Sequence, residues 1–220
     1  MTPIKAVLFD LDGTLLDTAP DLGKALNGVL QTSGLPALSD NIIRPFAGSG
    51  SKGLLKLGLN IEEHDPRYLT LTEQLLNFYQ EYLCDTTQLF PGMEDVLSFL
   101  EQNQIPWGVV TNKPAKYTDP LMKHLNLTSR AVCIISGDTL QNRKPHPEPI
   151  LHACSLLKQH PKDCLYVGDS EIDIIACKAA GSSSLAALYG YIPTGENPLQ
   201  WQADGYIKHP LDILNSFRRI

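Results

Sequence analysis

The sequence predicts an α/β protein whose core is a doubly wound parallel sheet with an inserted helical cap domain. Short, nearly continuous apolar runs, such as residues 4–9, 105–111 and 163–169, alternate with longer segments of helical spacing. Apolar runs without polar alternation are typical of strands buried on both faces of a parallel sheet. Strand–helix–strand order with short joints is typical of the α/β class.

The individual elements follow from the same two patterns. We expect strands in five runs, at residues 4–9, 105–111, 131–136, 163–169 and 183–188. Helical spacing of the apolar residues predicts helices at 93–103, 115–125, 147–158 and 171–180. These elements are enough for a Rossmann-like core.

The segment 18–85 departs from this alternation. It has mostly helical spacing, interrupted by GSGSKG, and it contains no convincing parallel strand. A connection of roughly 70 residues is far longer than an ordinary crossover. We therefore expect a core domain from 1–17 and 86–220 and a helical cap domain from 18–85. The alternative is that these helices simply pack on the sheet.

Composition and charge exclude several classes of protein. The net charge is −6 without a basic stripe, which argues against nucleic acid as a partner. No apolar stretch approaches the ~20 residues of a membrane span, and no signal-peptide pattern begins the chain. The five cysteines are scattered without a CxxC pair, so neither a disulfide framework nor a zinc site is expected. These features favour a cytoplasmic protein.

The first predicted strand ends on a pair of acidic residues, Asp10 and Asp12, followed by Gly13. Residues two apart in a strand point to the same side, and α/β sheets bind their ligands at the carboxyl ends of the strands. Two neighbouring carboxylates repel unless a cation joins them. One can then bind a hard cation such as Mg²⁺ and attack an electrophile, while the other moves a proton. The simpler alternative is an ordinary Asp/Gly turn.

Two further segments place polar residues near the same edge. Thr111 and Asn112 follow the strand at 105–111, where a hydroxyl can bind a phosphoryl oxygen or merely cap a helix. Lys144 precedes Pro145, which restricts the backbone and so positions the lysine. Arg143 is the alternative cation in that loop, although a compact ammonium better suits a site shared by carboxylates and phosphate.

A second acidic pair follows the strand at 163–169. Asp169 stands at the strand end, and Asp173 lies four residues later in the first turn of a helix, so that the two can converge. Asp169 is the better candidate for a metal ligand. Asp173 could bind the metal directly, reach it through water, or only favour the helix N-terminus.

In this order, the segments DLDGT, Thr111, Lys144 and GDSEID resemble the four motifs of the haloacid dehalogenase-like superfamily. The resemblance covers essentially the whole chain. It implies a phosphatase in which Asp10 is the nucleophile and forms an aspartyl-phosphate. It also implies that Asp12 protonates the leaving oxygen and later deprotonates the attacking water.

The resemblance assigns the remaining site residues as well. Mg²⁺ would bind Asp10, the backbone carbonyl of Asp12, and Asp169, with Asp173 supporting these ligands from nearby without binding the ion itself. Lys144 would neutralise charge, and the phosphate would be held by Gly13, Thr111, Asn112 and Lys144. The second aspartate of DLDGT argues against a dehalogenase, and the absence of DKTGT argues against a transport ATPase.

Within the superfamily the chain is most similar to the phosphoglycolate phosphatase-like branch. The segment 189–210 also resembles bacterial phosphatases of N-acetylmuramic acid 6-phosphate, which act in cell-wall recycling, and a β-phosphoglucomutase-like mutase is a further alternative. Each implies a small phosphorylated metabolite as the substrate. In the cap, Arg44 or Lys52 could meet a substrate carboxylate, unless the glycine-rich segment is only a connector.

Overall fold

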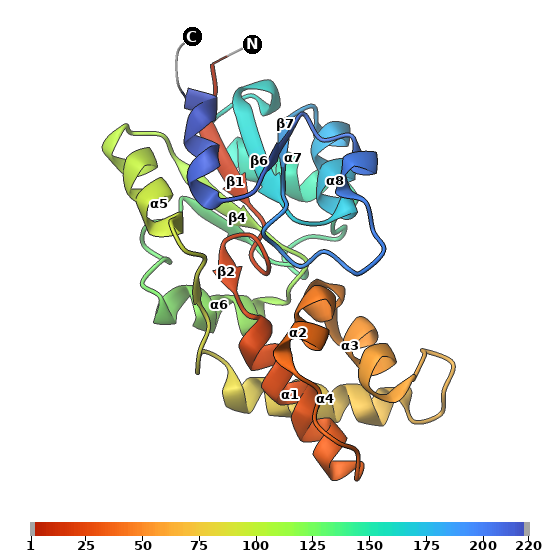
Figure 1. Ribbon diagram of the computed structural model, residues 1–220. Coiled ribbons are helices and arrows are strands. Elements are labelled where there is room, and N and C mark those ends of the chain that lie inside the picture. Colours follow the sequence, from red (N-terminus) through yellow and green to blue (C-terminus); the bar gives the residue numbers. More distant parts are fainter. Residues whose placement is uncertain (1–2, 218–220) are drawn as a thin grey trace.

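The structure is a computed structural model that describes residues 3–217. Its main feature is a parallel sheet of six strands in the order β5-β4-β1-β6-β7-β8 (Figure 1). The strands are β1 (Ala6–Phe9), β4 (Trp107–Val110), β5 (Cys133–Ile135), β6 (Cys164–Gly168), β7 (Ser183–Ala187) and β8 (Gly205–Ile207). The first strand in the chain therefore lies in the middle of the sheet.

Helices cover both faces of this sheet, which explains why its strands are apolar on both sides. The core helices are α5 (Met93–Gln102), α6 (Ala115–His124), α7 (Glu148–Leu156) and α8 (Glu171–Ala180). Alternate residues of β1 divide between two hydrophobic clusters: Val7 and Phe9 pack with α5 and α6, whereas Ala6 and Leu8 pack with α7 and α8. Short 3₁₀ turns complete the core at Pro161–Asp163, Pro198–Trp201 and Pro210–Phe217.

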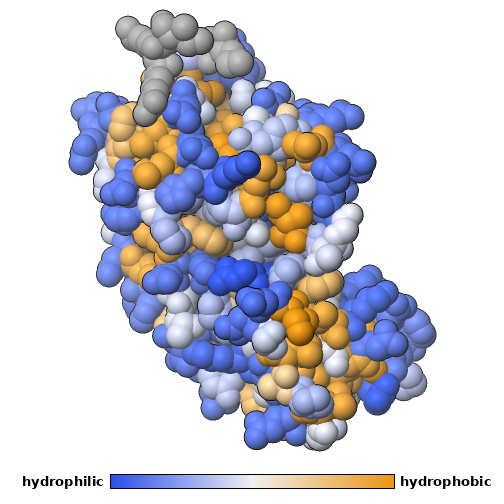
Figure 2. Space-filling model, viewed as in Figure 1, coloured by the Kyte–Doolittle hydropathy of each residue, from blue (hydrophilic) through white to orange (hydrophobic). Residues whose placement is uncertain are grey.

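Between β1 and α5 the chain forms a separate group of helices, which lies below the sheet in Figure 1. The group comprises α1 (Ala19–Thr32), α2 (Asp40–Ile43), a 3₁₀ helix (Arg44–Ser49), α3 (Gly50–Leu59) and α4 (Tyr68–Tyr82). α1 and α4 pack against each other most extensively. Figure 2 shows the sheet and this helical group as two lobes with an indentation where they meet. Hydrophilic and hydrophobic side chains are interspersed over this face.

The predicted α/β class is confirmed, and the five expected strands and four expected core helices are present. The sixth strand, β8, was not predicted. It is a three-residue edge strand that pairs with β7 alone, and its first two residues are partly exposed. The division into core and cap with boundaries at 17/18 and 85/86 stays a prediction. Within residues 3–217, no helix combines the length and the apolar character of a membrane span.

The two connections between the sheet and the helical group run side by side. β2 (Leu16–Asp17) and β3 (Gln88–Leu89) form an antiparallel pair. Next to it the buried carboxylate of Asp21, in the first turn of α1, accepts hydrogen bonds from the backbone N–H and the hydroxyl of both Thr86 and Thr87. Asp21 therefore ties the start of the helical group to its exit.

Replacing this carboxylate should weaken the fold measurably. We expect Asp21→Asn to lower the free energy of unfolding by about 2 kcal/mol. The amide loses the charge-assisted hydrogen bonds, and its NH₂ group would face the hydrogen-bond donors of Thr86 and Thr87. Burial opposes ionisation, but the hydrogen bonds from Thr86 and Thr87 outweigh it and lower the pKa of Asp21 below its usual 3.8. The stabilisation is therefore complete above that pH and is lost as the pH falls below it.

Denaturant unfolding at several pH values tests this expectation. The difference between wild type and Asp21→Asn should shrink below about pH 4, whereas the exposed Asp119→Asn should behave as wild type throughout. A difference that stays constant down to pH 2.5, or grows, would contradict the assignment of the stabilisation to the ionised carboxylate.

Candidate active site

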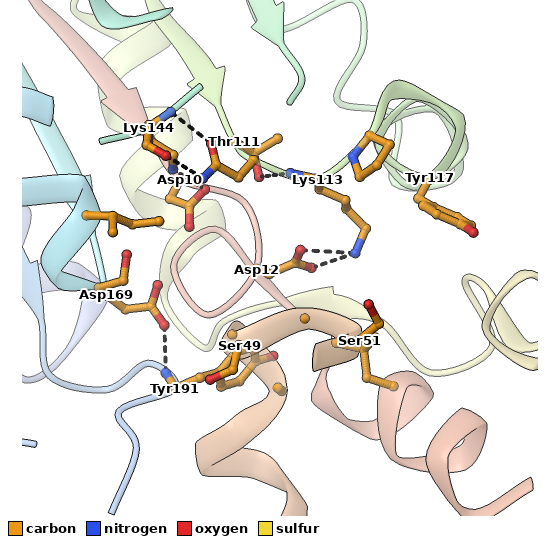
Figure 3. Close-up of a pocket in the computed structure, with 18 of the residues that line it drawn as sticks. Asp10, Asp12, Ser49, Ser51, Thr111, Lys113, Tyr117, Lys144, Asp169 and Tyr191 are labelled. Atoms are coloured by element: carbon orange, nitrogen blue, oxygen red, sulfur yellow. Dashed lines mark hydrogen bonds and ion pairs between the residues drawn. The ribbon is translucent and has the colours of Figure 1, made fainter. Parts of the chain in front are cut away.

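A cavity of about 580 Å³ opens between the carboxyl ends of the strands and the helical group. The core contributes residues that follow β1, β4 and β6, together with the loops around Lys144 and Tyr191. The opposite wall comes from residues 47–51 and from side chains of α1 and α4. Figure 3 shows Ser49 and Ser51 facing Asp12 across this space.

The strand register places the acidic residues at one level. Phe9 pairs with Val109 of β4 and with Val167 of β6, so that these three strands end together. The residues that follow β1 and β6 are Asp10 and Asp169, and both line the cavity. Carboxylate oxygens of Asp10, Asp169 and Asp173 all lie within 4.8 Å of one another. The structure thus brings Asp10 together with two acids, Asp169 and Asp173, that lie far from it in the sequence.

Lys144 lies in the middle of this acidic group. Its Nζ donates to Oδ1 of Asp10 at 2.8 Å and to Oδ1 of Asp173 at 2.6 Å. It also contacts the Tyr166 hydroxyl at 2.8 Å and the Val110 carbonyl at 3.0 Å. Burial opposes the charge, but Asp10 and Asp173 outweigh it and raise the pKa of Lys144, so that the ammonium is retained.

Asp173 accepts hydrogen bonds on both carboxylate oxygens, one of them from this lysine. Besides Lys144, its Oδ1 accepts from Tyr166, and its Oδ2 accepts from the backbone N–H and hydroxyl of Ser170. The Ser170 bonds form a capping box at the start of α8, which fixes the carboxylate in place. With all four bonds in use, Asp173 is suited to orienting Lys144 from behind.

Asp169 is buried, and nearby charges make its ionised form unfavourable. Its Oδ1 accepts from the Thr14 hydroxyl at 3.2 Å, and its Oδ2 accepts from the Tyr191 N–H at 2.7 Å. Burial, followed by the charges of Asp10 and Asp173, raises the pKa of Asp169 well above its ordinary value. Gly13, with φ of +80°, allows this arrangement, because a Cβ there would collide with the Asp169 carboxylate.

These acids suit a hard divalent cation. Burial raises the pKa of Asp10 to about 6, against the attraction of Lys144. The Oδ2 of Asp10 accepts no hydrogen bond from any residue of the described chain, and each Asp169 oxygen has a lone pair left after its one bond. A divalent cation between Asp10 and Asp169 would relieve the repulsion that raises both pKa values.

Asp12 points away from this group, and its partner was not foreseen from the sequence. Lys113 Nζ lies 3.0 Å from both carboxylate oxygens of Asp12 (Figure 3). The Thr18 hydroxyl donates to Oδ1 of the same carboxylate at 2.6 Å. The ammonium also lies 4.6 Å from the ring centroid of Tyr79 on α4. A metal contact from Asp12 would therefore come from its backbone carbonyl, as the resemblance implies.

The other predicted phosphate ligands have distinct partners. The Thr111 hydroxyl accepts from the Lys113 N–H at 3.2 Å, which leaves its own hydrogen free to donate. The Asn112 side chain is used differently: its amide exchanges two hydrogen bonds with the backbone of Lys144, at 2.8 and 3.0 Å. A phosphate contact from Asn112 would thus have to come from its backbone.

The two cap cations expected near the substrate are occupied elsewhere. Arg44 forms a bidentate pair with Asp17, with both N–O distances at 2.9 Å, and the Tyr191 hydroxyl donates to the same carboxylate at 2.8 Å. Lys52 pairs on the surface with Glu63 at 2.6 Å. Neither Arg44 nor Lys52 lines the cavity, so the structure does not bring them to the acidic group.

Comparison with known families identifies the class of protein that this fold and site define. The family of haloacid dehalogenase-like hydrolases matches residues 7–187, which include Asp10, Asp12, Lys144, Asp169 and Asp173. The chain belongs to this family.

Named relatives narrow the comparison to phosphatases. The chain is 42% identical over 206 residues to a phosphoglycolate phosphatase of Xanthomonas campestris, covering 94% of this chain and 93% of the relative. It is 39% identical over 210 residues to an N-acetylmuramic acid 6-phosphate phosphatase of Pseudomonas putida, covering 96% and 94%. The crystal structure of a predicted phosphoglycolate phosphatase from Haemophilus somnus matches with a TM-score of 0.85 at 30% identity, covering 99% of this chain and 100% of that one.

Proposed function

We propose that this protein is a Mg²⁺-dependent phosphomonoester hydrolase that works through an aspartyl-phosphate on Asp10. The observation that carries the proposal is the convergence of Asp10, Asp169 and Lys144 at the carboxyl ends of adjacent strands, inside a cavity. The phosphatase names of the relatives at 39–42% identity support the same class of reaction.

Asp10 would supply the nucleophile. Lys144 contacts its Oδ1, and one oxygen of the Asp10 carboxylate attacks phosphorus while the bond between phosphorus and the ester oxygen breaks. Asp12 would give its proton to the departing oxygen and then take one from the water that attacks the phosphorus of the aspartyl-phosphate. That second step returns the Asp10 carboxylate and releases inorganic phosphate.

The phosphoryl group would be held by donors around Asp10. Lys144 supplies positive charge, the Thr111 hydroxyl has a hydrogen to donate, and the backbone N–H groups of Gly13 and Asn112 are candidates for the other oxygens. Asn112 and Asp173 would act indirectly, because both fix the position of Lys144.

Asp10, Asp169 and the carbonyl of Asp12 would hold Mg²⁺, with Asp173 nearby. When bound, the ion would offset the negative charge that otherwise keeps a carboxylate and a phosphate dianion apart. The hard oxygen ligands fit this cation. The pKa values of Asp10 and Asp169 are raised because both carboxylates are buried close to other acids, and the positive charge of the ion would offset that repulsion.

Phosphoglycolate is the leading substrate, on the similarity to the Xanthomonas enzyme. N-acetylmuramic acid 6-phosphate is the second candidate, because the Pseudomonas relative carries that activity in its name and a cavity of about 580 Å³ does not exclude a hexosamine phosphate. The crystal structure of a putative β-phosphoglucomutase from Thermotoga maritima matches at 24% identity, which supports the fold alone.

A panel of phosphate esters, assayed by release of inorganic phosphate, tests the proposal. We expect hydrolysis with Mg²⁺, loss of at least 100-fold with a chelator, and recovery when Mg²⁺ is restored. In Asp169→Asn, added Mg²⁺ should not restore the rate. Full activity in the chelator would exclude the metal role, and phosphate release that requires a sugar bisphosphate would favour a mutase.

A further inference from the structure

The two aspartates that follow β1 are held by different lysines. Lys144 donates to Asp10 at 2.8 Å, whereas the Nζ of Lys113 lies 3.0 Å from both carboxylate oxygens of Asp12 (Figure 3). Each acid therefore has its own ammonium, and the two carboxylates are drawn in different directions. The proposed attack on phosphorus involves Asp10 and Lys144, so the lysine beside Asp12 needs a separate explanation.

The backbone of Lys113 is fixed at the edge of the sheet. Asp12 and Lys113 each stand three residues beyond the end of a strand, β1 and β4 respectively, and these strands are neighbours. The Lys113 N–H donates to the Thr111 hydroxyl at 3.2 Å. The Lys113 carbonyl accepts from the Gly137 N–H at 2.9 Å and from the Thr118 hydroxyl at 3.2 Å. The ammonium therefore extends toward Asp12 from a fixed point.

The ion pair between Lys113 and Asp12 is largely shielded from water. The side chains of Lys113 and Asp12 are 7% and 19% exposed. The Lys113 ammonium lies 4.6 Å from the ring centroid of Tyr79 on α4, and the Thr18 hydroxyl, next to the start of α1, donates to Oδ1 of Asp12. A carboxylate that accepts hydrogen bonds on both oxygens from fixed donors has little freedom to rotate.

Stability alone is a weak explanation for this pair. Desolvation of two buried charges offsets most of their attraction, so a buried ion pair adds little net stability. Position matters more for a residue that transfers a proton, because a general acid must lie within hydrogen-bond reach of the atom that receives it. A misplacement of about 1 Å can cost about 100-fold in rate. Both Asp12 and Lys113 line the cavity in which that atom would lie.

We propose that Lys113 is a positioning residue for proton transfer. Its ammonium holds the carboxylate of Asp12 in the direction needed to reach the ester oxygen, and the ring of Tyr79 supports the ammonium from the helical group. The inference rests on the proposed function, in which Asp12 gives its proton to the ester oxygen as the bond from that oxygen to phosphorus breaks. Lys113 itself neither gives nor takes a proton.

Two esters that differ by one methylene test this role. 4-Nitrobenzyl phosphate releases an alcohol and needs a proton on its leaving oxygen, whereas 4-nitrophenyl phosphate releases a stable phenolate and needs none. kcat/KM covers only the steps up to departure of that oxygen. In Lys113→Met we expect kcat/KM to fall by about 100-fold for the benzyl ester and by about threefold or less for the phenyl ester. Equal losses would indicate that Lys113 binds the substrate itself, and would overturn the proposal.

Removal of the Asp12 carboxylate shows whether Lys113 acts through it. Asp12→Asn alone should also lose far more activity with the benzyl ester. Asp12→Asn/Lys113→Met should stay within about threefold of Asp12→Asn, because no carboxylate remains to be positioned. Multiplicative losses would contradict the positioning role. Equal losses with both esters in Asp12→Asn would instead refute the acid role of Asp12 in the proposed function, and the positioning role with it.

Lys123→Met is the matched control, because Lys123 lies on α6, is exposed and does not line the cavity. It should match wild type with both esters. Methionine is unbranched like lysine and packs well against aromatic rings, so Lys113→Met should keep its packing on Tyr79.

Crystal structures of wild type and Lys113→Met test the positioning without turnover. We expect the Asp12 carboxylate to leave its wild-type direction in Lys113→Met, while Asp10 and Asp169 keep theirs. A turned carboxylate would support the proposal even if neither ester were hydrolysed, which would contradict only the proposed activity. An Asp12 carboxylate that keeps its direction without the lysine would overturn the proposal.

Discussion

Asp10→Asn should reduce phosphate release by about 10⁴-fold or more, because an amide oxygen cannot serve as the nucleophile. Lys144 would keep its contacts with Asp173, Tyr166 and Val110, so the loop around it should hold its position. The measurement is initial-rate hydrolysis of the best ester in the panel, with the exposed Asp119→Asn as the control.

The same variant should be as stable as wild type or more stable when no divalent cation is present. Burial raises the pKa of Asp10 to about 6, so the fold disfavours its ionised form. This destabilisation is fully present above the folded pKa and disappears as the pH falls below the usual 3.8. A neutral residue removes it. A lower thermal midpoint than wild type at pH 7.5, or activity within tenfold of wild type, would contradict this role for Asp10.

Lys144→Met should lose both activity and stability. The substitution leaves the buried carboxylates of Asp10 and Asp173 without their ammonium, and breaking a buried pair in this way costs about 3–5 kcal/mol. We expect the rate of hydrolysis to fall by about 10³-fold or more, because the positive charge that offsets the negative charges of the nucleophile and the phosphate is lost. Chemical denaturation and initial rates measure the two effects.

A double-mutant cycle on the free energy of unfolding distinguishes loss of the Lys144–Asp173 ion pair from simple loss of packing. In Lys144→Met/Asp173→Asn the second change removes the stranded charge, so the double variant should be destabilised by less than the sum of the two single variants. The surface variant Lys123→Met should match wild type in rate and stability. Strictly additive losses would show that the pair does not hold the loop as described.

The central part of the fold could be predicted because its strands are buried on both faces. Residues 4–9 and 163–169 are apolar without alternation, a pattern that few other elements share. β8 escaped prediction because it is a short, half-exposed edge strand whose pairing depends on β7. The β2–β3 pair has only two residues in each strand and joins segments more than 70 residues apart, so no local sequence pattern predicts it.

In the site, residues that follow strands could be predicted, and residues that face them across the cavity could not. Asp10 and Asp169 stand at strand ends, and the fold class fixes where such ends meet. Lys113 was missed, although it lies in the same TNKP segment as Thr111, because its contact with Asp12 spans 101 residues. Its second partner, Tyr79, comes from a helix whose orientation the sequence does not reveal.

The cap cations illustrate the same limit. The sequence predicts that Arg44 or Lys52 meets a substrate carboxylate, unless the glycine-rich segment is only a connector. In the structure Arg44 forms a bidentate pair with Asp17, 27 residues earlier, and a contact of either cation with substrate stays a prediction. Charge and neighbouring glycines cannot tell whether a basic residue meets a ligand or an acidic residue of the chain itself. That distinction requires the packing of the helical group against the sheet.

Trapping the acyl phosphate identifies the acid to which phosphorus becomes attached, which is the claim on which the mechanism depends. Enzyme quenched during turnover and reduced with borohydride should contain homoserine at position 10, found by peptide mass spectrometry, and Asp10→Asn should give none. Homoserine at position 12, 169 or 173, or no reduced acid in a preparation that turns over, would contradict the account.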